Sequence, residues 1–181
     1  METQTDLLND FSIEKRGDIE VQYNISVNKF VLLSVLTGGL YELWWVYKAW
    51  RFFKEKDRLD IMPAMRAIFS IFFLYSLFNR ILDYSNEKGY TGNYSSGFLF
   101  IAFILSNLLA YLPDPFWLIS LLSVFILLPP FKALNYAKQN STEFATVEQE
   151  GFNTRQVVLI LIGVVFWSLA LAGLMMNDYE L

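Results

Sequence analysis

The chain has 181 residues, of which 55% are hydrophobic and only 18% are charged, whereas a typical soluble domain carries about 25% charged residues. It contains no His and no Cys, which excludes disulfides, thiolate or imidazole metal sites, cysteine nucleophiles and every catalytic triad that needs His. The net charge is −4, and six of the 18 acids precede residue 29, opposed there only by Lys15 and Arg16. We therefore expect an acidic, mostly disordered tail over residues 1–28 and a short second tail over 178–181.

Apolar segments fill the rest of the chain, at about 30–50, 64–83, 97–112, 116–136 and 156–176. The last segment carries no charge, and about 20 apolar residues suffice to cross a bilayer. Asn153, with Gln156 three positions further on, is placed to cap this helix. A soluble protein of this size does not hide five such segments, with 5 Trp, 10 Tyr and 17 Phe residues, in one core. The sequence predicts an all-α, polytopic integral membrane protein in which residues 29–177 form a single helical domain.

The charge distribution leaves open whether four or five segments cross. Lys and Arg concentrate in cytoplasmic loops, and their densest group lies at 48–66, which we place inside. With five crossings, six basic residues lie inside and eight outside, which contradicts the rule. The count becomes nine inside and five outside if the segment 30–50 is re-entrant or interfacial, and equally if only one of the segments 97–112 and 116–136 crosses.

The first segment has unusual features of its own. Thr37-Gly38-Gly39 interrupts it, and beyond the glycines charged residues recur three or four positions apart among Trp and Tyr, which are typical of the headgroup level. These residues predict a helix that continues into an amphipathic stretch at the cytoplasmic face. Acids dilute the basic cluster, so we expect membrane lipids as partners and no nucleic acid. The expected lipid-headgroup anchors are Lys48, Arg51, Arg58 and Arg66.

The third and fourth segments are expected to form a tight helical hairpin. Leu112-Pro113-Asp114-Pro115 is a turn signal, and Pro115 suits the first turn of a helix. Pro129-Pro130 is expected to end or kink the fourth segment, and the polar stretch 140–153 is expected to be a loop.

A ligand or ion pathway is the functional interpretation of three polar residues close to apolar segments, namely Glu42, Arg80 and Asn107. An ionisable group at bilayer depth is a functional candidate by default, so Glu42 is read as a proton or cation site, or as the partner of an Arg. The alternatives are structural: Glu42 as a solvated interfacial carboxylate, Arg80 as a helix-end anchor paired with Asp83, and Asn107 as a hydrogen-bonding contact between helices.

Three motifs resemble a known family. They are GLYELWWVYKAW at 39–50, PAMRAIFSIFFLYSLF at 63–78 and LPDPFWLISLLSVFILLPP at 112–130. Together with the last apolar helix they resemble a family of small bacterial inner-membrane proteins with a domain of unknown function, over residues 28–176. The resemblance implies a location in the bacterial inner membrane and assigns no activity to any residue.

No sequence motif for catalysis, phosphate binding or metal binding is present, so we expect no enzyme, no cofactor and no metal site. The leading hypothesis is a non-enzymatic subunit, scaffold or regulator that forms a homo-oligomer or binds another membrane protein. The first alternative is a small oligomeric transporter or channel subunit. The second is a lipid-handling membrane enzyme that uses Glu42 or Asp83 with Arg80.

Overall fold

The computed structural model describes residues 21–177, and this part of the chain is mostly helical, as predicted. The elements are β1 (Gln22–Asn24), α2 (Val27–Leu36), α3 (Leu40–Lys56), α4 (Pro63–Ile68), α5 (Ser70–Glu87), α6 (Ser96–Leu108), the 3-10 helices η1 (Leu109–Tyr111) and η2 (Phe116–Leu122), α7 (Ser123–Gln139), β2 (Thr146–Glu148) and α8 (Thr154–Asn177).

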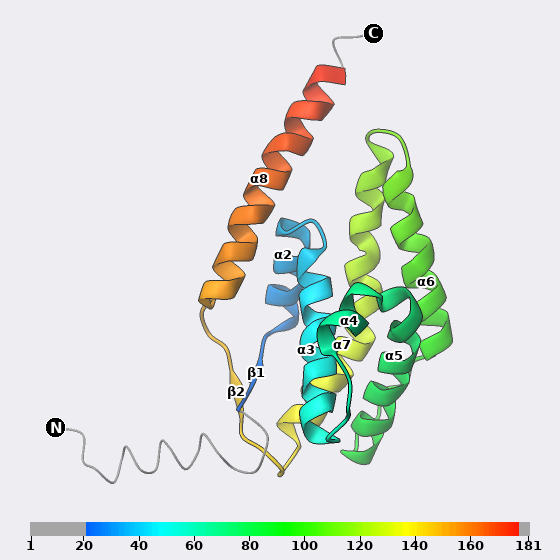
Figure 1. The fold of residues 1–181 in the computed structure, drawn as a ribbon, viewed down its shortest axis with the longest axis vertical. Coiled ribbons are helices and arrows are strands. Elements are labelled where there is room, and N and C mark those ends of the chain that lie inside the picture. Colours follow the sequence, from blue (N-terminus) through cyan, green and yellow to red (C-terminus); the bar gives the residue numbers. More distant parts are fainter. Residues whose placement is uncertain (1–20, 178–181) are drawn as a thin grey trace, which may run out of the picture.

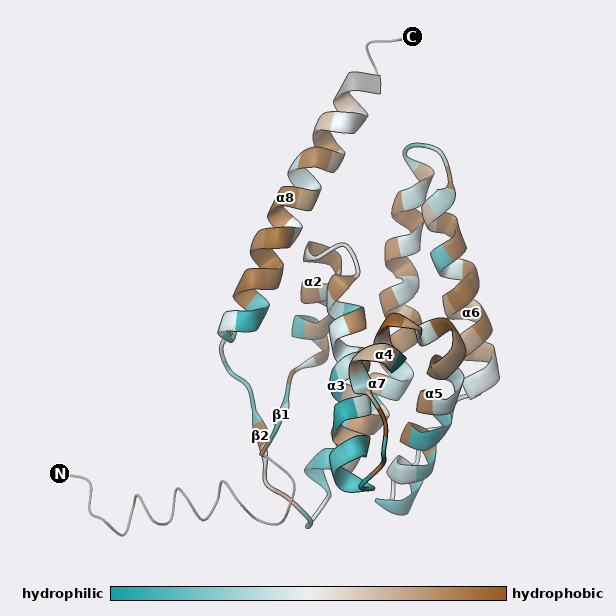
Figure 2. Ribbon diagram, viewed as in Figure 1, coloured by the Kyte–Doolittle hydropathy of each residue, from teal (hydrophilic) through white to brown (hydrophobic). Residues whose placement is uncertain are grey.

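Apart from the short helix α4, the helices lie roughly along one long axis, and the molecule has two chemically different ends (Figure 1). We call the polar end the one formed by β1, β2 and the C-terminal halves of α3, α5 and α7. The apolar end is formed by η1, η2 and the C-terminal half of α8. Figure 2 shows hydrophilic residues gathered at the polar end and long hydrophobic stretches in α6, α7 and α8. Polarity is therefore separated along the long axis.

The predicted interruption at residues 37–39 reverses the chain between α2 and α3. Gly38 and Gly39 have positive φ angles of 58° and 88°, a conformation that side chains with a Cβ rarely adopt. Thr37 completes the turn, because its hydroxyl donates to the carbonyl of Leu33 at 2.7 Å and accepts from the amide of Tyr41 at 3.0 Å. Segment 30–50 is thus a helical hairpin rather than one continuous helix.

The core surrounds α3, which packs against α2, α4 and α5 and contacts α7 through Trp45. The ring of Phe30 in α2 stacks on Phe131 in α7 with centroids 4.2 Å apart, and Trp45 of α3 packs against both. Further along α3, Trp50 and Phe52 are fully buried. Aromatic residues of α3 therefore pack in the protein core, although their density in the sequence predicted a position only at the membrane interface.

Segment 64–83 is also broken, because α4 ends at Ile68 and α5 begins at Ser70. Beyond it, α6 and η1 rise to the turn at Pro113-Asp114-Pro115, and η2 and α7 return, as the predicted hairpin requires (Figure 1). Helix α7 continues through Pro129 and Pro130, so of the two effects predicted for these prolines, an end or a kink, the helix end does not occur.

Two short strands lie in regions for which the sequence predicted a disordered tail (1–28) and a loop (140–153). β1 pairs in parallel with β2, with Gln22 opposite Thr146 and Asn24 opposite Glu148. Asn24 is buried, and its side-chain amide donates to the carbonyl of Asn135 in α7. Residues 21–28 therefore belong to the folded domain, and the expected disorder of residues 1–20 lies outside the described part. Three-residue strands give too short a pattern to be recognised in sequence.

Within residues 21–177, two helical stretches are long and apolar enough to cross a membrane, Phe116–Gln139 and Thr154–Gly173. The prediction of four to five such helices was too high. Glycines break the first segment and the junction at Phe69 breaks the second, while α6 with η1 is apolar but shorter. In the most apolar 18-residue window of each stretch, 39% is buried for Phe116–Gln139 and only 11% for Thr154–Gly173.

Helix α8 touches the rest of the molecule mainly at the α2–α3 turn. Trp167 donates its indole N–H to the carbonyl of Val35 at 3.1 Å. Gly163 allows this close approach, because a Cβ at that position would lie only 2.0 Å from the carbonyl oxygen of Leu36. The two backbones could not keep this distance with any other residue at 163.

This contact predicts that Gly163→Ala weakens the attachment of α8. Overpacking of this kind costs about 1–3 kcal/mol, which corresponds to a fall of several degrees in the melting temperature of a chain of this size. The control is Gly173→Ala in the same helix, where the added Cβ meets nothing within 4 Å and the helix propensity improves. Thermal unfolding of the purified protein should show a loss at 163 and none at 173, and equal effects would contradict the packing.

Candidate functional site

Two of the cavities that contain residues singled out by the sequence are candidates for a functional site. The first, which we call the basic pocket, lies at the polar end between α3, β1 and the start of α8. The second, which we call the Glu42 cavity, lies beside the α2–α3 turn and reaches α6, η2 and α7.

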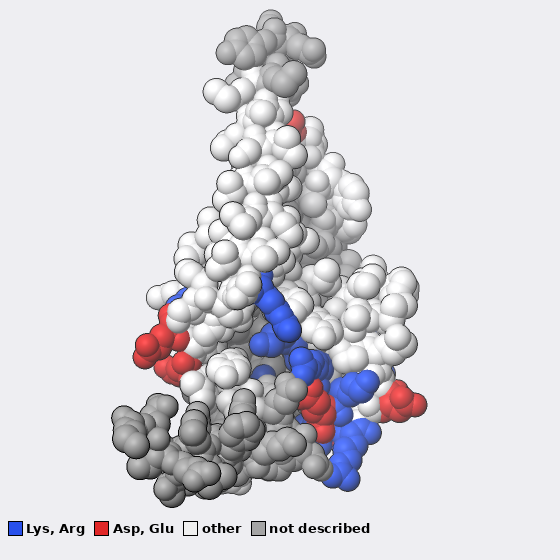
Figure 3. Space-filling view, turned by 60° about the vertical axis from the view of Figure 1, so that its left-hand side comes forward, with Lys and Arg blue, Asp and Glu red and all other residues white. Residues whose placement is uncertain are grey.

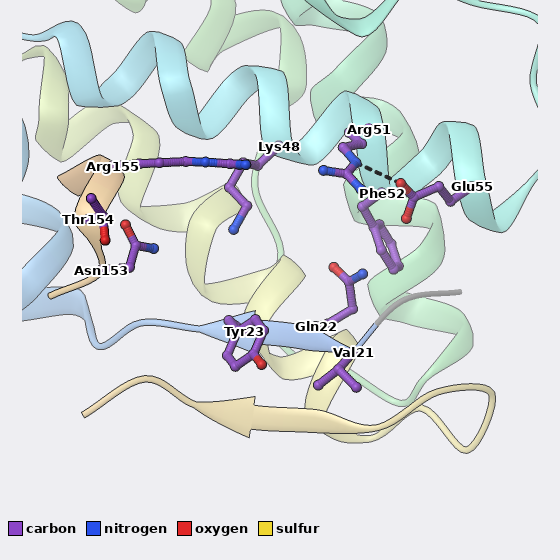
Figure 4. Close-up of a pocket in the computed structure, with 10 residues that line it drawn as sticks. All are labelled: Val21, Gln22, Tyr23, Lys48, Arg51, Phe52, Glu55, Asn153, Thr154 and Arg155. Atoms are coloured by element: carbon purple, nitrogen blue, oxygen red, sulfur yellow. Dashed lines mark hydrogen bonds and ion pairs between the residues drawn. The ribbon is translucent and has the colours of Figure 1, made fainter. Parts of the chain in front are cut away.

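The basic pocket is an open cavity of about 540 Å³. In Figure 4 the side chain of Lys48 points from α3 toward β1, and that of Arg155 extends from the start of α8 toward Lys48. Arg51 lies one turn further along α3 and pairs with Glu55 at 2.7 Å. The complete lining is Val21, Gln22, Tyr23, Lys48, Arg51, Phe52, Glu55, Asn153, Thr154 and Arg155.

Positive charge dominates this pocket. Among residues 21–177, neither Lys48 nor Arg155 forms an ion pair, and Glu55 is the single acid in the lining. Burial, followed by the positive charges of Arg51 and Arg155, lowers the pKa of Lys48, which lies at the polar end. Three cations are thus held close enough to repel one another, an arrangement that an anion would stabilise.

Hydrogen bonds position the start of α8, and with it the backbone of Arg155. Asn153 and Gln156 form the predicted capping box: the Asn153 side chain accepts from the amide of Gln156, and the Gln156 side chain accepts from the amide of Asn153, both at 2.9 Å. The Gln156 amide also donates to the hydroxyl of Tyr41 in α3 at 3.0 Å. The guanidinium of Arg155 lies 5.8 Å from the ring of Trp44.

The surface charge follows the same division between the two ends. Figure 3 shows Lys and Arg gathered in the lower half of the visible face, directly below a column without basic residues. In the sequence, Asp114 is the single charged residue between positions 89 and 131, and none lies between 156 and 177. The basic pocket therefore lies where the charged surface meets the start of the long apolar helix.

The Glu42 cavity has about 310 Å³ and brings together Glu42 and Asn107. Glu42 is only 5% exposed, and both of its carboxylate oxygens lie within hydrogen-bonding distance of the Ser123 hydroxyl, at 3.2 and 3.1 Å. The side-chain amide of Asn107 donates to the carbonyl of Phe103 in its own helix. Ser70 and Ser120 also line the cavity. The carboxylate is thus buried, in contact with a hydroxyl and close to an open space.

Arg80 does not join these two residues. It pairs with Asp57 at 2.7 Å, across from α5 to the end of α3, and not with the expected Asp83. Arg80 and Asp83 do line one surface hollow, which Asp57 and Glu87 share. The pathway predicted from Glu42, Arg80 and Asn107 is therefore only partly assembled, because Arg80 belongs to a different site.

The four residues expected to anchor lipid headgroups do not lie at one site. Lys48 and Arg51 line the basic pocket, whereas Arg58 lies in the exposed loop after α3. The guanidinium of Arg66 lies 4.4 Å from the ring of Trp50 and 5.0 Å from that of Phe73. Arg66 is therefore partly engaged with aromatic rings of the core.

Sequence reasoning missed Arg155 as a site residue because it lies more than 100 positions from Lys48. Its position directly before the last apolar helix was a usable signal, since basic residues commonly flank such helices at the membrane interface. Ser123 lies within an apolar segment, and nothing in its local sequence indicates that its hydroxyl faces Glu42.

Within residues 21–177, no group of three or more His, Cys, Asp and Glu side chains is placed to hold a metal ion. Comparison with known proteins gives no match: no protein-family model, no curated protein and no solved structure resembles the chain significantly.

Proposed function

We propose that the chain is a multi-pass membrane protein that enters the bilayer with α8 and the α6–α7 hairpin. The observation that carries the proposal is the exposure of α8. The core helix of a soluble protein is mostly buried, whereas only 11% of the apolar window of α8 is buried and its outward side chains are large and apolar. In a bilayer, lipid acyl chains would contact these apolar side chains, so they need not pack against other protein segments.

The distribution of charge supports the same placement. With α2–α3 as a re-entrant hairpin, and with α4 and α5 on the polar side, the loops at 57–62, 88–95 and 140–153 all lie at the polar end (Figure 1). Basic residues then lie on one side, which the positive-inside rule makes cytoplasmic. This arrangement removes the conflict that five crossings create.

The role that we propose is that of a non-enzymatic subunit, scaffold or regulator in a bacterial inner-membrane assembly. Support comes from the outer face of α8, where Ser168 and Ala172 are exposed and lie four positions apart. Small residues at this spacing let two membrane helices approach closely. A second copy of the chain, or another membrane protein, can pack against this face.

A second candidate function is ion or proton transfer by an oligomer, and the Glu42 cavity favours it. Glu42 and Asn107 come from separate elements and meet in one space close to the apolar end, and a buried ionisable group in such a place is a functional candidate. Arg80 is not part of this cavity, so the candidate rests on Glu42 and Asn107.

The proposed placement predicts the side from which single cysteines react. Because the chain has no Cys, each introduced thiol is the only one present. Asp60→Cys, Thr91→Cys and Thr142→Cys lie in exposed loops at the polar end and should react with a membrane-impermeant maleimide from the cytoplasmic side. Tyr111→Cys, at a residue 87% exposed at the apolar end, should react from the opposite side.

The unmodified chain is the blank, and the labelling is measured on intact spheroplasts and on inverted vesicles. Five crossings would place position 60 opposite to positions 91 and 142, which would contradict the proposal. Recovery of the chain in the supernatant after membranes are sedimented would contradict membrane placement altogether.

The proposed role predicts self-association or a stable membrane partner. In lipid nanodiscs, native mass spectrometry should detect a dimer or a larger assembly, and Ser168→Leu with Ala172→Leu should shift it toward the monomer by separating the helices. Ile162→Leu, at an exposed position of α8 that helical spacing places to the side of Ser168 and Ala172, is the control. A monomer without any co-purified membrane protein would end the scaffold hypothesis.

The second candidate predicts a flux that depends on Glu42. Proteoliposomes carrying a pH-sensitive dye and an imposed potential should take up protons, and Glu42→Gln should reduce the rate to that of empty liposomes, because an amide does not exchange a proton in this range. Glu87→Gln makes the same chemical change at an exposed position and should leave the rate intact. Equal rates for the wild type and Glu42→Gln would exclude this function.

A further inference from the structure

The basic pocket combines residues that neither α3 nor α8 could assemble alone. Lys48 and Arg51 lie one turn apart on α3, and the capping box at the start of α8 places Arg155 opposite them (Figure 4). The space between them is open and has about 540 Å³, enough for a phosphate group with its substituents.

Within residues 21–177, the charges of Lys48 and Arg155 are not neutralised by an ion pair. Glu55 is engaged with Arg51, and no acid in residues 21–177 pairs with Lys48 or Arg155. Converging cations are costly for a folded protein unless an anion offsets their repulsion, and guanidinium groups bind phosphate oxygens with two parallel hydrogen bonds. The partly positive N-terminus of α8 adds to the attraction.

The position of the pocket relative to the apolar helix α8 is also defined. It adjoins Thr154, the first residue of the long apolar stretch Thr154–Gly173, and Trp44 lies beside Arg155. If α8 crosses the bilayer as proposed, Arg155 lies at the level of the headgroup phosphates, where Trp is also enriched.

We propose that the basic pocket binds a phosphate group, carried either by an anionic phospholipid headgroup or by a small soluble phosphate compound. Arg155 and Lys48 contact the phosphate oxygens, and Arg51, held by Glu55, adds to the positive field. The lipid form of this proposal rests on the proposed membrane placement, whereas the phosphate chemistry does not.

Binding to the purified full-length chain in uncharged detergent micelles tests the proposal. The probes are phosphatidylglycerol, phosphatidylcholine as a lipid without net charge, and inorganic phosphate, and binding is followed by native mass spectrometry and titration calorimetry. We expect the double variant Lys48→Gln with Arg155→Gln to weaken binding of the phosphate probe by roughly tenfold or more, because charge-assisted contacts are lost.

The matched control is Lys54→Gln with Lys132→Gln, which removes the same net charge at two exposed positions outside the pocket. Lys48→Arg with Arg155→Lys keeps the charge and should retain most of the binding. It also keeps the proposal testable if the double glutamine variant lowers the melting temperature.

The two sources of phosphate give different results. A lipid site binds phosphatidylglycerol in preference to phosphatidylcholine and is not displaced by millimolar inorganic phosphate, whereas a soluble-ligand site binds inorganic phosphate without lipid. Equal weakening in the pocket and control variants, or no binding of either phosphate probe by the wild type, would overturn the proposal. The binding assay uses micelles and does not depend on how the chain is placed in a bilayer. A lack of phosphate binding would therefore overturn this proposal without overturning the membrane placement, which cysteine labelling tests.

Discussion

The reversal of the chain at residues 37–39 is the constraint on which the rest of the structure depends. Gly38 and Gly39 supply the left-handed backbone, and the Thr37 hydroxyl bonds to both helices that the turn joins. Because Gly163 brings the backbone of α8 against Leu36, the same turn also positions the long apolar helix. Thr37 is buried, and its hydroxyl forms hydrogen bonds both with the end of α2 and with the start of α3.

This reversal determines where charge lies. Had α2 and α3 formed one continuous helix, the basic residues of α3 would lie at the opposite end of the molecule from Lys29. Instead α3 returns to the polar end, where Lys48 meets Arg155 and Arg80 pairs with Asp57. The basic pocket and the separation of polar from apolar surface therefore follow from one local conformation.

The two cavities show how far a sequence can predict a site. The ionisable residue Glu42 and the polar residue Asn107 were recognised by their place in apolar segments, and the fold brings both to one cavity. Arg80 was grouped with them on the same argument but lies elsewhere, since membership of an apolar segment does not say which face a side chain occupies. Ser123 and Arg155 were missed as site residues because their partners are distant in sequence.

The sequence by itself determined the helical class, the break at the glycines, the hairpin turn at Pro113 to Pro115 and the capping box of α8, because each depends on residues within a few positions of one another. The tertiary structure alone decided which apolar segments are long, continuous and exposed, and which residues meet in the two cavities. It also ordered residues 22–24, whose pairing with 146–148 rests on backbone hydrogen bonds that leave no pattern in a three-residue strand. Turns and helix caps depend on interactions between residues that are close in sequence. Membrane crossing and ligand binding depend on contacts between distant segments, which only folding brings together.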